Sequence, residues 1–341
     1  MAGGVGSRFW PVSTPEKPKQ FIDILGTGKT LIQATVSRFK GVCPDENIYI
    51  VTNKQYSNII KEQLPFMEED QILLEPCMRN TAPCIAYAVN KIYSKNKEAN
   101  IIVSPADHFI QDEKTFQEII QKGLGAALDN GALITLGITP SYPATGYGYI
   151  EQLKDETLVP EIYKSNGFKE KPQLDVAEKY IEQGNFLWNS GIFIWTAKTS
   201  IKALENYLPE IQKAFVGLSN KYYSKSEREE LNTIYENCEN ISIDYGVMEK
   251  ADNVYVIPSD FGWSDVGSWK ALYDLAAKDE SDNVITNSAK YIESKGNLVN
   301  VPDGKKVIVQ GAEGFMVIDT GDTLLITKID QDQRIKEFSK L

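Results

Sequence analysis

The chain has 341 residues, of which 42% are hydrophobic and 24% charged, and its formal net charge at pH 7 is −11. This length allows a large hydrophobic core and about two domains. The acidic balance disfavours a nucleic-acid-binding surface, and no apolar run reaches the length of a membrane span. The single histidine, His108, excludes a multi-histidine metal site, and four scattered cysteines are typical of a reducing compartment. We therefore expect a cytoplasmic protein without nucleic-acid or membrane partners.

Near its start the chain carries a glycine-rich loop, residues 3–19, in which two cations, Arg8 and Lys19, are well placed to meet an anion. Glycines leave backbone N–H groups accessible and permit positive φ, so such a loop can close around a polyphosphate. Arg8 and Lys19 would add positive charge to those amides. The spacing is not that of a P-loop, and the dinucleotide pattern G-x-G-x-x-G is incomplete. A dinucleotide-dependent oxidoreductase is therefore disfavoured.

Further along, short apolar runs alternate with amphipathic stretches, which is typical of an α/β sheet covered by helices on both faces. The predicted strands are 48–52, 72–75, 101–104, 133–138 and 192–195. The predicted helices are 30–39, 56–64, 81–93, 115–129, 176–183 and 199–215. The predicted fold is α/β, with a Rossmann-like, mostly parallel sheet flanked by helices.

After about residue 277 the pattern changes to short β-type runs punctuated by glycine, with no long helical pattern. These runs are 290–293, 298–301, 306–309, 315–319 and 323–327. They predict a small all-β domain over residues 284–341, which the linker 278–282 joins to a catalytic domain over residues 1–277. A homodimer formed through this C-terminal domain is one arrangement that the sequence allows.

Two aspartates are candidate magnesium ligands. Asp107 follows the predicted strand 101–104, and ligand sites in open α/β sheets lie beyond the carboxyl ends of strands. Asp265 stands between glycines and tryptophans just before a helical stretch. Each has a plain structural alternative, a loop cap for Asp107 and a helix N-cap for Asp265, and position alone favours those alternatives. We interpret His108 as structural.

Four other segments place polar residues or glycines in loops next to strands or helices, namely Arg79-Asn80, Tyr147-Gly148, Glu170-Lys171 and Asn189 with Gly191. Each can be read structurally. The segment Arg79-Asn80 could be only a strand-to-helix loop, and Tyr147-Gly148 a plain hairpin. Lys171 could be a solvated lysine, and residues 189–191 could form a turn that leads into a buried strand. None of the four would indicate a function by itself.

In their order and spacing, these segments resemble the sugar nucleotidyltransferases, which join a sugar 1-phosphate to a nucleoside triphosphate. That family shares the glycine loop ending in Pro-Lys-Gln-Phe at 18–21, the metal aspartates and the Glu-Lys-Pro lysine. Residues 79–83, 105–108 and 188–191 are similar to the bacterial branch that uses mannose 1-phosphate and GTP. The resemblance covers most of residues 2–270.

The resemblance implies transfer of GMP from GTP to mannose 1-phosphate, by in-line attack on the α-phosphorus with Mg²⁺, giving GDP-mannose and pyrophosphate. The implied nucleotide-binding residues are Ala2, Gly3, Gly4, Gly6, Ser7, Arg8, Lys19, Arg79, Asn80 and Asp107. The implied sugar phosphate-binding residues are Tyr147, Gly148, Glu170, Lys171, Asn189 and Gly191. Asp107 and Asp265 are the implied metal ligands. The implied catalytic residues are Arg8, Lys19, Asp107, Lys171 and Asp265.

The physical chemistry of this reaction suits the residues present. A phosphate monoester is largely deprotonated at neutral pH, because its second pKa is about 6. The nucleophile therefore needs no general base, and positioning plus neutralisation of charge supplies most of the catalysis. Two alternatives stay open: a nucleotidyltransferase that uses glucose 1-phosphate and a different nucleotide, and a regulatory homologue that only binds sugar nucleotides. The presence of Lys19, Asp107, Lys171 and Asp265 favours an enzyme.

Two departures from the family pattern lead to further expectations. Relatives usually begin with a hydrophobic strand that runs into the glycine loop, whereas here Met1 directly precedes Ala2. We expect the natural polypeptide to carry a short Val/Ile/Leu-rich strand upstream of Ala2. Bifunctional relatives also carry a metal-dependent isomerase domain. With one histidine in the chain, we expect the transferase activity alone.

Overall fold

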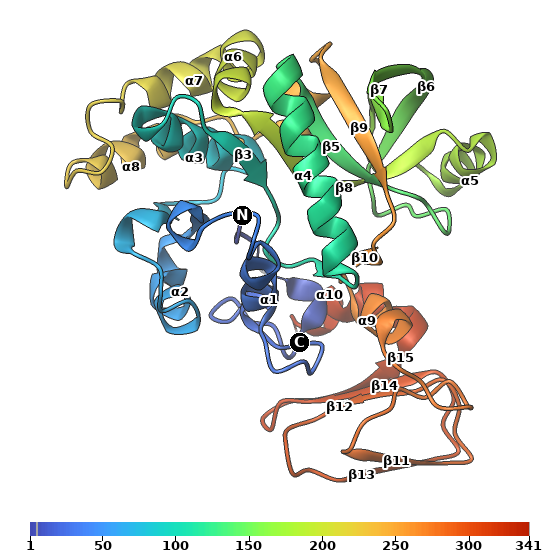
Figure 1. The fold of residues 1–341 in the computed structure, drawn as a ribbon. Helices are drawn as coiled ribbons and strands as arrows, with labels where there is room; N and C mark the ends of the chain where they lie inside the picture. The colour runs from blue at the N-terminus through green and yellow to red at the C-terminus, as the bar shows by residue number, and fades with distance from the viewer. Residues whose placement is uncertain (5, 341) are drawn as a thin grey trace. The chain divides into compact units, whose positions relative to one another are not determined.

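The structure is a computed structural model that describes residues 1–4 and 6–340. Val5, in the glycine loop, and Leu341, in the predicted C-terminal domain, lie outside the described residues. Packing divides the chain into two compact units (Figure 1). The large unit comprises Met1–Gly3, Val36–Ala106 and Ile110–Trp263, and the small unit comprises Gly4–Thr35, Asp107–Phe109 and Ser264–Leu341. The domain boundaries expected from sequence, 1–277 and 284–341, stay a prediction.

A six-stranded sheet forms the centre of the large unit, in the order β3-β8-β5-β9-β7-β6. Its strands are β3 (Asn100–Val103), β5 (Leu133–Ile138), β6 (Tyr149–Val159), β7 (Ile162–Lys169), β8 (Phe186–Thr196) and β9 (Val254–Ser259). β5 pairs with β9 in parallel, while β8 is antiparallel to β3, β5 and β6, and β7 is antiparallel to β6 and β9. β3, β5, β6 and β9 therefore run in one direction, and β7 and β8 in the other. The predicted α/β class is confirmed.

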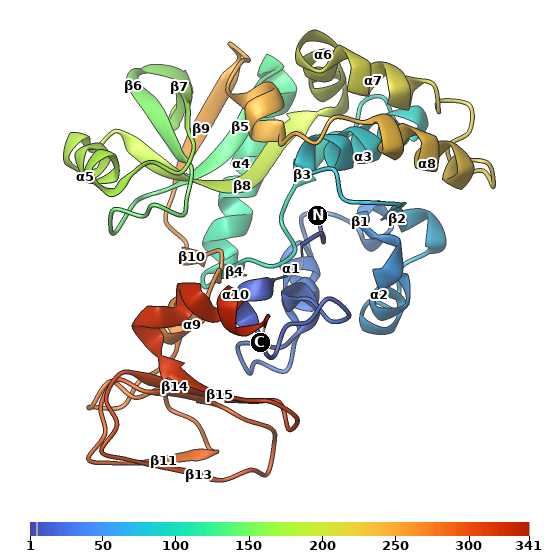
Figure 2. The same ribbon diagram turned by 180° about the vertical axis from the view of Figure 1, so that it is seen from behind.

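Helices cover both faces of this sheet. Along β8, Phe193 and Trp195 belong to one buried cluster, while Ile192 and Ile194 belong to another, because successive side chains of a strand point to opposite faces. The first cluster includes α3 (Thr81–Lys95) and α6 (Ala197–Tyr207), and the second includes α4 (Glu113–Asn130). Figures 1 and 2 show α4 lying along one face and α3 and α6 covering the other. Both faces of the sheet are thus shielded from water.

The remaining helices of the chain up to residue 263 are α1 (Leu31–Arg38), α2 (Ser57–Gln63), α5 (Leu174–Gln183), α7 (Pro209–Val216) and α8 (Glu227–Asn237). The helix predicted at 199–215 is divided into α6 and α7. Pro209 occupies the first position of α7, where its missing N–H is not needed, but the same residue cannot continue α6. Among the described residues, no helix combines the length and the apolar character that a membrane span requires.

Met1 and Ala2 connect the sheet to a separate parallel pair, β1 (Ile50–Asn53) and β2 (Ile72–Glu75). The N–H of Ala2 donates to the carbonyl of Val51 at 2.8 Å, and the terminal amine of Met1 donates to the carbonyl of Ser104 at 2.8 Å. The N–H of Ala106 donates to the carbonyl of Met1 at 2.9 Å. The first two residues therefore bridge β1 and the segment that follows β3.

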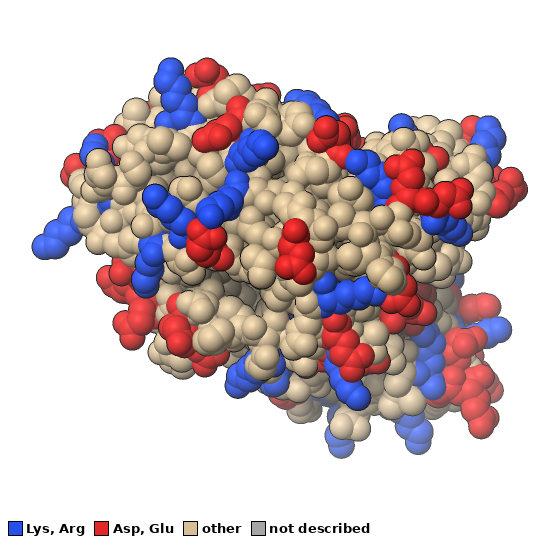
Figure 3. Space-filling model, turned by 45° about the horizontal axis from the view of Figure 1, so that its top comes forward, with Lys and Arg blue, Asp and Glu red and all other residues tan. Residues whose placement is uncertain are grey.

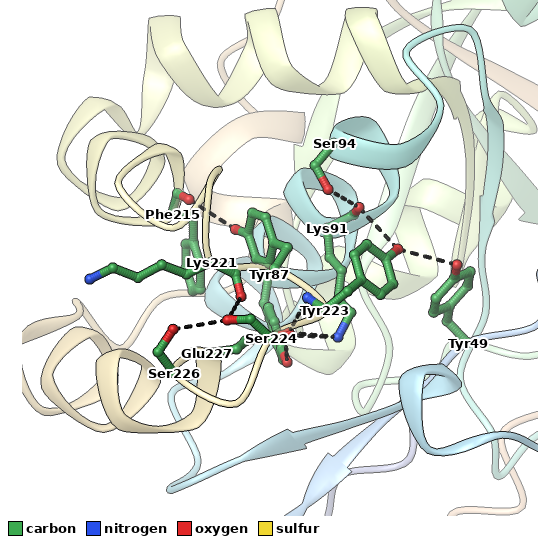
Figure 4. Close-up of polar contacts among 11 residues, drawn as sticks. Tyr49, Tyr87, Lys91, Ser94, Phe215, Lys221, Tyr223, Ser224, Ser226 and Glu227 are labelled. Carbon is green, nitrogen blue, oxygen red and sulfur yellow. Dashed lines mark hydrogen bonds and ion pairs between the residues drawn. The ribbon is translucent and has the colours of Figure 1, made fainter.

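A buried ion pair fastens α8 to α3 (Figure 4). The ammonium of Lys91 lies 2.8 Å from Oε1 of Glu227, and both side chains are almost completely buried. The hydroxyl of Tyr87 donates to the same oxygen at 2.5 Å, and the N–H of Tyr223 donates to Oε2 at 2.8 Å. Burial and the neighbouring carboxylate raise the pKa of Tyr87, which keeps it a donor. Each oxygen of Glu227 is thus paired, as a buried charge requires.

The small unit combines the N-terminal glycine loop with the C-terminal strands. Its strands are β11 (Ala289–Ile292), β12 (Leu298–Asn300), β13 (Val307–Gln310), β14 (Phe315–Asp319) and β15 (Leu324–Lys328). β11 pairs with β13 and β12 with β14 in parallel, and β14 pairs with β15 antiparallel. Two short strands, β4 (Phe109–Ile110) and β10 (Trp263–Ser264), lie where the chain passes between the units. The β character predicted for this region is confirmed.

The core of the small unit joins residues from both ends of the chain. Phe9 packs on Trp269 of α9 (Trp269–Leu275), with ring centroids 5.1 Å apart, and the indole N–H of Trp269 donates to the carbonyl of Trp10 at 3.3 Å. After β15 the chain forms a 3₁₀ segment, Ile329–Arg334, and the short helix α10 (Ile335–Phe338). Ile335 is buried in the same core. The sequence pattern did not predict these last helical turns.

Charged side chains of both signs lie next to one another on the surface drawn in Figure 3. Neighbouring charges of opposite sign partly neutralise each other. Among the described residues drawn in that view, basic side chains are interrupted by acidic ones.

Candidate active site

A pocket of about 300 Å³ lies in the small unit. It is lined by Gly6, Ser7, Arg8, Phe9, Lys19, Asp107, His108, Asp265, Gly267 and Lys336. Four of the five predicted catalytic residues, Arg8, Lys19, Asp107 and Asp265, come together here from stretches far apart in the sequence. His108, interpreted from sequence as structural, also lines this pocket, and Lys336 was not predicted at all.

Gly6 shapes the wall of this pocket. Its φ is 59°, and a Cβ placed on it would lie only 2.7 Å from Cβ of Lys19 and 3.0 Å from Oγ of Ser13. Both the backbone conformation and the close approach therefore require glycine. A short 3₁₀ turn follows, in which Phe9 is anchored in the core while Arg8 is exposed at the pocket. Among the described residues, no carboxylate or carbonyl is bonded to Arg8, so its guanidinium is available to an anion.

Lys19 is the central connection of the pocket and is only 5% exposed. Its ammonium lies 3.0 Å from Oδ2 of Asp107. It also donates to the carbonyls of Asp265 at 2.7 Å and Val266 at 3.1 Å. An ammonium has three donors, and these three partners account for them. Lys19 therefore links the loop that carries it to both candidate metal ligands.

Asp107 is held as an anion. Its side chain is 31% exposed, and His108 Nε2 lies 3.8 Å from Oδ1. Partial burial raises the pKa of this carboxyl, but the charge of Lys19, the neighbouring imidazole of His108 and the hydrogen bond from Lys19 together outweigh that effect, so the pKa is lowered. Within the described part of the chain, its carboxylate accepts no backbone hydrogen bond, unlike a capping aspartate. The loop-cap alternative for Asp107 is therefore not supported.

Asp265 is also not the helix cap that the sequence allowed. The N-cap of α9 is Ser268, whose hydroxyl accepts a hydrogen bond from the N–H of Ala271 at 3.3 Å. Asp265 instead closes a tight turn, in which Oδ1 accepts from the N–H of Gly267 at 2.9 Å. Oδ2 of Asp265 is also close to this glycine, because a Cβ atom on Gly267 would lie only 2.6 Å from Oδ2. This turn fixes the Asp265 carboxylate at the wall of the pocket.

The predicted sugar-side residues lie together in the large unit. The ammonium of Lys171 lies 2.5 Å from Oε1 of Glu170, and Lys171 has a positive φ of 43°. A Cβ at Gly148 would lie 2.7 Å from Oε2 of Glu170, so the glycine lets this carboxylate approach the backbone closely. The N–H of Asn189 donates to the carbonyl of Gly148 at 2.8 Å. Four of the predicted residues are thereby in one neighbourhood.

Asn189 contacts Asp244, an acidic residue that the sequence pattern does not indicate. Its amide donates to Oδ1 of Asp244 at 2.7 Å, and its Oδ1 accepts from the N–H of Gly191 at 3.0 Å, where φ is 68°. Asp244 begins a π-helical turn. Burial raises the pKa of Asp244, the bond from Asn189 lowers it, and the charge of Glu170 raises it, with a raised pKa as the net result. An isolated aspartate before a tyrosine carries no sequence signal, and only the fold brings it to Asn189.

Tyr147 belongs to an aromatic cluster beside these groups. Its ring centroid lies 5.1 Å from that of Trp188 and 5.4 Å from that of Trp263, both in edge-on geometry. Tyr142 contacts Trp188 in the same way at 4.9 Å. Aromatic faces of this kind are suited to the apolar face of a sugar ring or to packing alone.

The remaining predicted residues lie outside the pocket. Arg79 donates from Nε to the carbonyl of Tyr235 at 2.7 Å and from Nη2 to that of Glu236 at 3.2 Å, at the end of α8. Asn80 has a positive φ of 68°, and its side chain accepts from the N–H of Thr81 as the N-cap of α3. Ala2, Gly3 and Gly4 are not among the described lining residues either. A role for these five in nucleotide binding stays a prediction.

Comparison with known proteins identifies the group to which this architecture belongs. Residues 1–282 match the family described as nucleotidyl transferase. The chain belongs to the nucleotidyl transferase family. This match covers the large unit and most of the pocket-lining segments, including both aspartates and both loop cations.

Relatives of this nucleotidyl transferase carry specific names. An Escherichia coli mannose-1-phosphate guanylyltransferase is 34% identical over 345 residues, which cover 99% of this chain and 74% of the relative. The alginate biosynthesis protein AlgA of Pseudomonas aeruginosa is 34% identical over 100% of this chain and 70% of the relative. A crystal structure from Thermus thermophilus, named mannose-1-phosphate geranyltransferase, superimposes with a TM-score of 0.90 at 32% identity, covering 100% of this chain and 97% of that one.

Proposed function

We propose that this nucleotidyl transferase transfers GMP from GTP to α-D-mannose 1-phosphate, giving GDP-mannose and pyrophosphate. The names of relatives that match essentially the whole of this chain support the substrates. The observation that carries the chemistry is the pocket that unites Arg8, Lys19, Asp107 and Asp265. A different sugar 1-phosphate with a different nucleotide, and a non-catalytic homologue, are the rival functions.

In the small unit, we assign the pocket to the phosphates of GTP. The backbone at Gly6 and Ser7 and the side chain of Arg8 would bind phosphate oxygens, since glycine-loop amides and guanidinium groups both suit them. Lys19 would hold the two aspartates in place and keep the Asp107 carboxylate charged.

The donor set of this pocket fits Mg²⁺. Two carboxylates line it, and Mg²⁺ is typically bound by one or two carboxylates together with substrate phosphates and waters. No cluster of three or more His, Cys, Asp or Glu residues suited to a metal occurs among the described residues, which agrees with a site completed by substrate. Asp107 and Asp265 would hold the ion. When bound, Mg²⁺ would neutralise phosphate charge.

In the large unit, we assign the residues around Glu170 and Asn189 to mannose 1-phosphate. Lys171 would bind the sugar phosphate, and its flexible, exposed ammonium can leave Glu170 for a more highly charged partner. Glu170 and Asn189 offer an acceptor and an amide for sugar hydroxyls, while Tyr147 would pack on the ring. Gly148 and Gly191 keep this wall free of side chains.

The reaction needs no base from the protein. An oxygen of the mannose phosphate attacks the α-phosphorus of GTP, and the bond to the departing pyrophosphate breaks on the opposite side. The nucleophile is already an anion at neutral pH. The protein therefore contributes positioning and positive charge, for which Arg8, Lys19 and Lys171 are the proposed residues.

Pyrophosphate release from a matrix of substrates tests this function. We expect the pair GTP and mannose 1-phosphate, with Mg²⁺, to be turned over far faster than any other pair of a nucleoside triphosphate with glucose or mannose 1-phosphate. Comparable rates with dTTP and glucose 1-phosphate would contradict the assignment of substrates. Tight binding of GDP-mannose without turnover of any pair would indicate the non-catalytic homologue.

Location and assembly belong to the same proposal. The four free cysteines support a cytoplasmic location, because thiols persist in a reducing compartment. A homodimer through residues 284–341 stays a prediction, for which light scattering on the full chain is the test. We propose no nucleic-acid or membrane partner.

A further inference from the structure

Lys336 is the one residue of the phosphate pocket that lies at the opposite end of the chain from the glycine loop. It belongs to α10, and it lines the pocket together with Arg8, Lys19 and the two aspartates. Its side chain is exposed, and no ion pair joins it to another described residue. A solvated surface lysine is the ordinary interpretation of such a residue, so its placement needs an independent reason.

The packing of α10 provides that reason. Ile335, immediately before Lys336, is completely buried in the same core as Phe9, and α10 packs against the turn Ser7–Phe9 that carries Arg8. Phe338 packs against this core as well. In Figure 2 the red C-terminal turn lies beside the blue N-terminal segment. The packing of Ile335 and Phe338 therefore holds Lys336 next to the glycine loop.

The charges of the pocket show what such a cation could do. Two lining residues, Asp107 and Asp265, are acidic, and the ammonium of Lys19 is already engaged by Asp107 and two carbonyls. Arg8 and Lys336 are the lining cations, among the described residues, that have no protein partner. A triphosphate brings several negative charges, and binding it beside two carboxylates requires cations that are not already paired.

We infer that Lys336 binds the phosphates of the nucleotide, so that the C-terminal turn α10 completes the phosphate pocket. This inference rests on the proposed function, since it gives a further residue of the same site. By this assignment, Lys336 contacts the substrate directly. The role of the C-terminal strands is then to bring the chain back to the glycine loop.

Four proteins test the inference: wild type, Lys336→Met, Lys336→Arg and the control Lys306→Met, which removes an exposed lysine elsewhere in the C-terminal region. Affinity for GTP and for inorganic pyrophosphate, each with Mg²⁺, is measured by calorimetry, and KM for GTP by pyrophosphate release. Loss of one charge-assisted contact corresponds to a roughly tenfold or larger loss of affinity. We expect that loss for Lys336→Met, partial recovery in Lys336→Arg, and wild-type affinity in the control.

The outcomes separate the inference from the proposed function. Wild-type affinity for both ligands in folded Lys336→Met would overturn the inference while leaving the guanylyltransferase assignment intact. Preference for another triphosphate, with the same dependence on Lys336, would overturn the substrate assignment and support the inference. If Lys336→Met does not fold by thermal melting, Lys336→Gln is measured in its place, and the same affinities decide.

Discussion

The ammonium of Lys19 lies 3.0 Å from the carboxylate of Asp107 while it also donates to the carbonyl of Asp265. One buried cation thus fixes the two residues that we assign to the metal. Its donors are occupied by the protein, so we expect Lys19 to act mainly as a positioning residue. This differs from the direct phosphate contact that the sequence resemblance implies.

Replacing Lys19 with methionine should therefore affect stability and catalysis together. Lys19→Met leaves the partly exposed Asp107 carboxylate and two carbonyls without their donor, and we expect the free energy of unfolding to fall by about 1–3 kcal/mol. We also expect kcat to fall more than GTP affinity. The exposed neighbour Lys17→Met is the matched control in denaturant titration and steady-state kinetics. Unchanged stability with a selective loss of GTP affinity would favour the direct phosphate contact instead.

The two aspartates should be needed for turnover but not for folding. Asp107→Asn and Asp265→Asn each remove one negative oxygen donor, and we expect kcat to fall roughly a hundredfold or more. Because both side chains face the pocket, far-UV circular dichroism should stay unchanged. The exposed Asp260→Asn serves as control. An aspartate whose variant keeps near-normal kcat at saturating Mg²⁺ is not a metal ligand.

Lys171→Met should impair the use of one substrate only. The lost contact to the sugar phosphate is charge-assisted and is worth about 1.5–3 kcal/mol, or roughly ten- to hundredfold in kcat/KM for mannose 1-phosphate. Binding of GTP, measured separately by calorimetry, should be close to that of wild type. The assignment fails if GTP affinity falls while KM for mannose 1-phosphate stays the same.

Glu75 should make stability depend on pH. It is 5% exposed and accepts a hydrogen bond from the hydroxyl of Tyr235 at 3.0 Å. Burial raises the pKa of Glu75 to about 7, although the Tyr235 bond acts in the opposite direction. In the folded state Glu75 therefore keeps a proton that it releases in the unfolded state once the pH exceeds the ordinary carboxyl pKa of 4.5. Its contribution to stability is complete below that pH and is lost as the pH rises toward 7.

Glu75→Gln should remove this dependence. Urea titrations between about pH 4.5 and 7 measure the slope, to which one such group contributes up to about 1.4 kcal/mol per pH unit. We expect a flatter profile in Glu75→Gln than in wild type, and no change in the exposed control Glu62→Gln. Parallel profiles for wild type and Glu75→Gln would mean that Glu75 titrates normally.

The ion pair between Lys91 and Glu227 should be a major stabilising contact of the large unit. Glu227→Gln keeps the volume but leaves the buried ammonium of Lys91 unpaired, which typically costs about 3–5 kcal/mol. The exposed Glu229→Gln should have little effect on the midpoint of thermal unfolding. A change below about 1 kcal/mol in Glu227→Gln would show that water reaches the pair.

Local pattern was sufficient for some elements and failed for others, each for a physical reason. Strands β2, β5 and β14 coincide with their predicted ranges because they are apolar runs with clear ends. The hairpin β6–β7 was missed, since the outer half of β6 is exposed and rich in charge. Such a strand is stabilised by pairing with its neighbours rather than by an apolar run, and pairing cannot be read from one segment.

Sequence pattern also identifies some residues of the site and misses others. Motif order was enough to predict Arg8, Lys19, Asp107 and Asp265, which the fold does bring to one pocket. It could not predict Lys336, because nothing near that residue indicates that the chain returns to the glycine loop. The motif around Arg79 suggests the nucleotide, and its guanidinium is bonded to the end of α8, so a role of Arg79 in nucleotide binding stays a prediction.

The fate of labelled phosphate tests the central claim most directly. The protein is incubated with Mg²⁺, mannose 1-phosphate and GTP labelled with ³²P at either the α or the γ position, and the products are separated by chromatography. We predict that the α label appears in GDP-mannose and the γ label in pyrophosphate, both only when mannose 1-phosphate is present. Transfer of the γ label to the sugar, or no transfer of the α label, would contradict the proposed reaction.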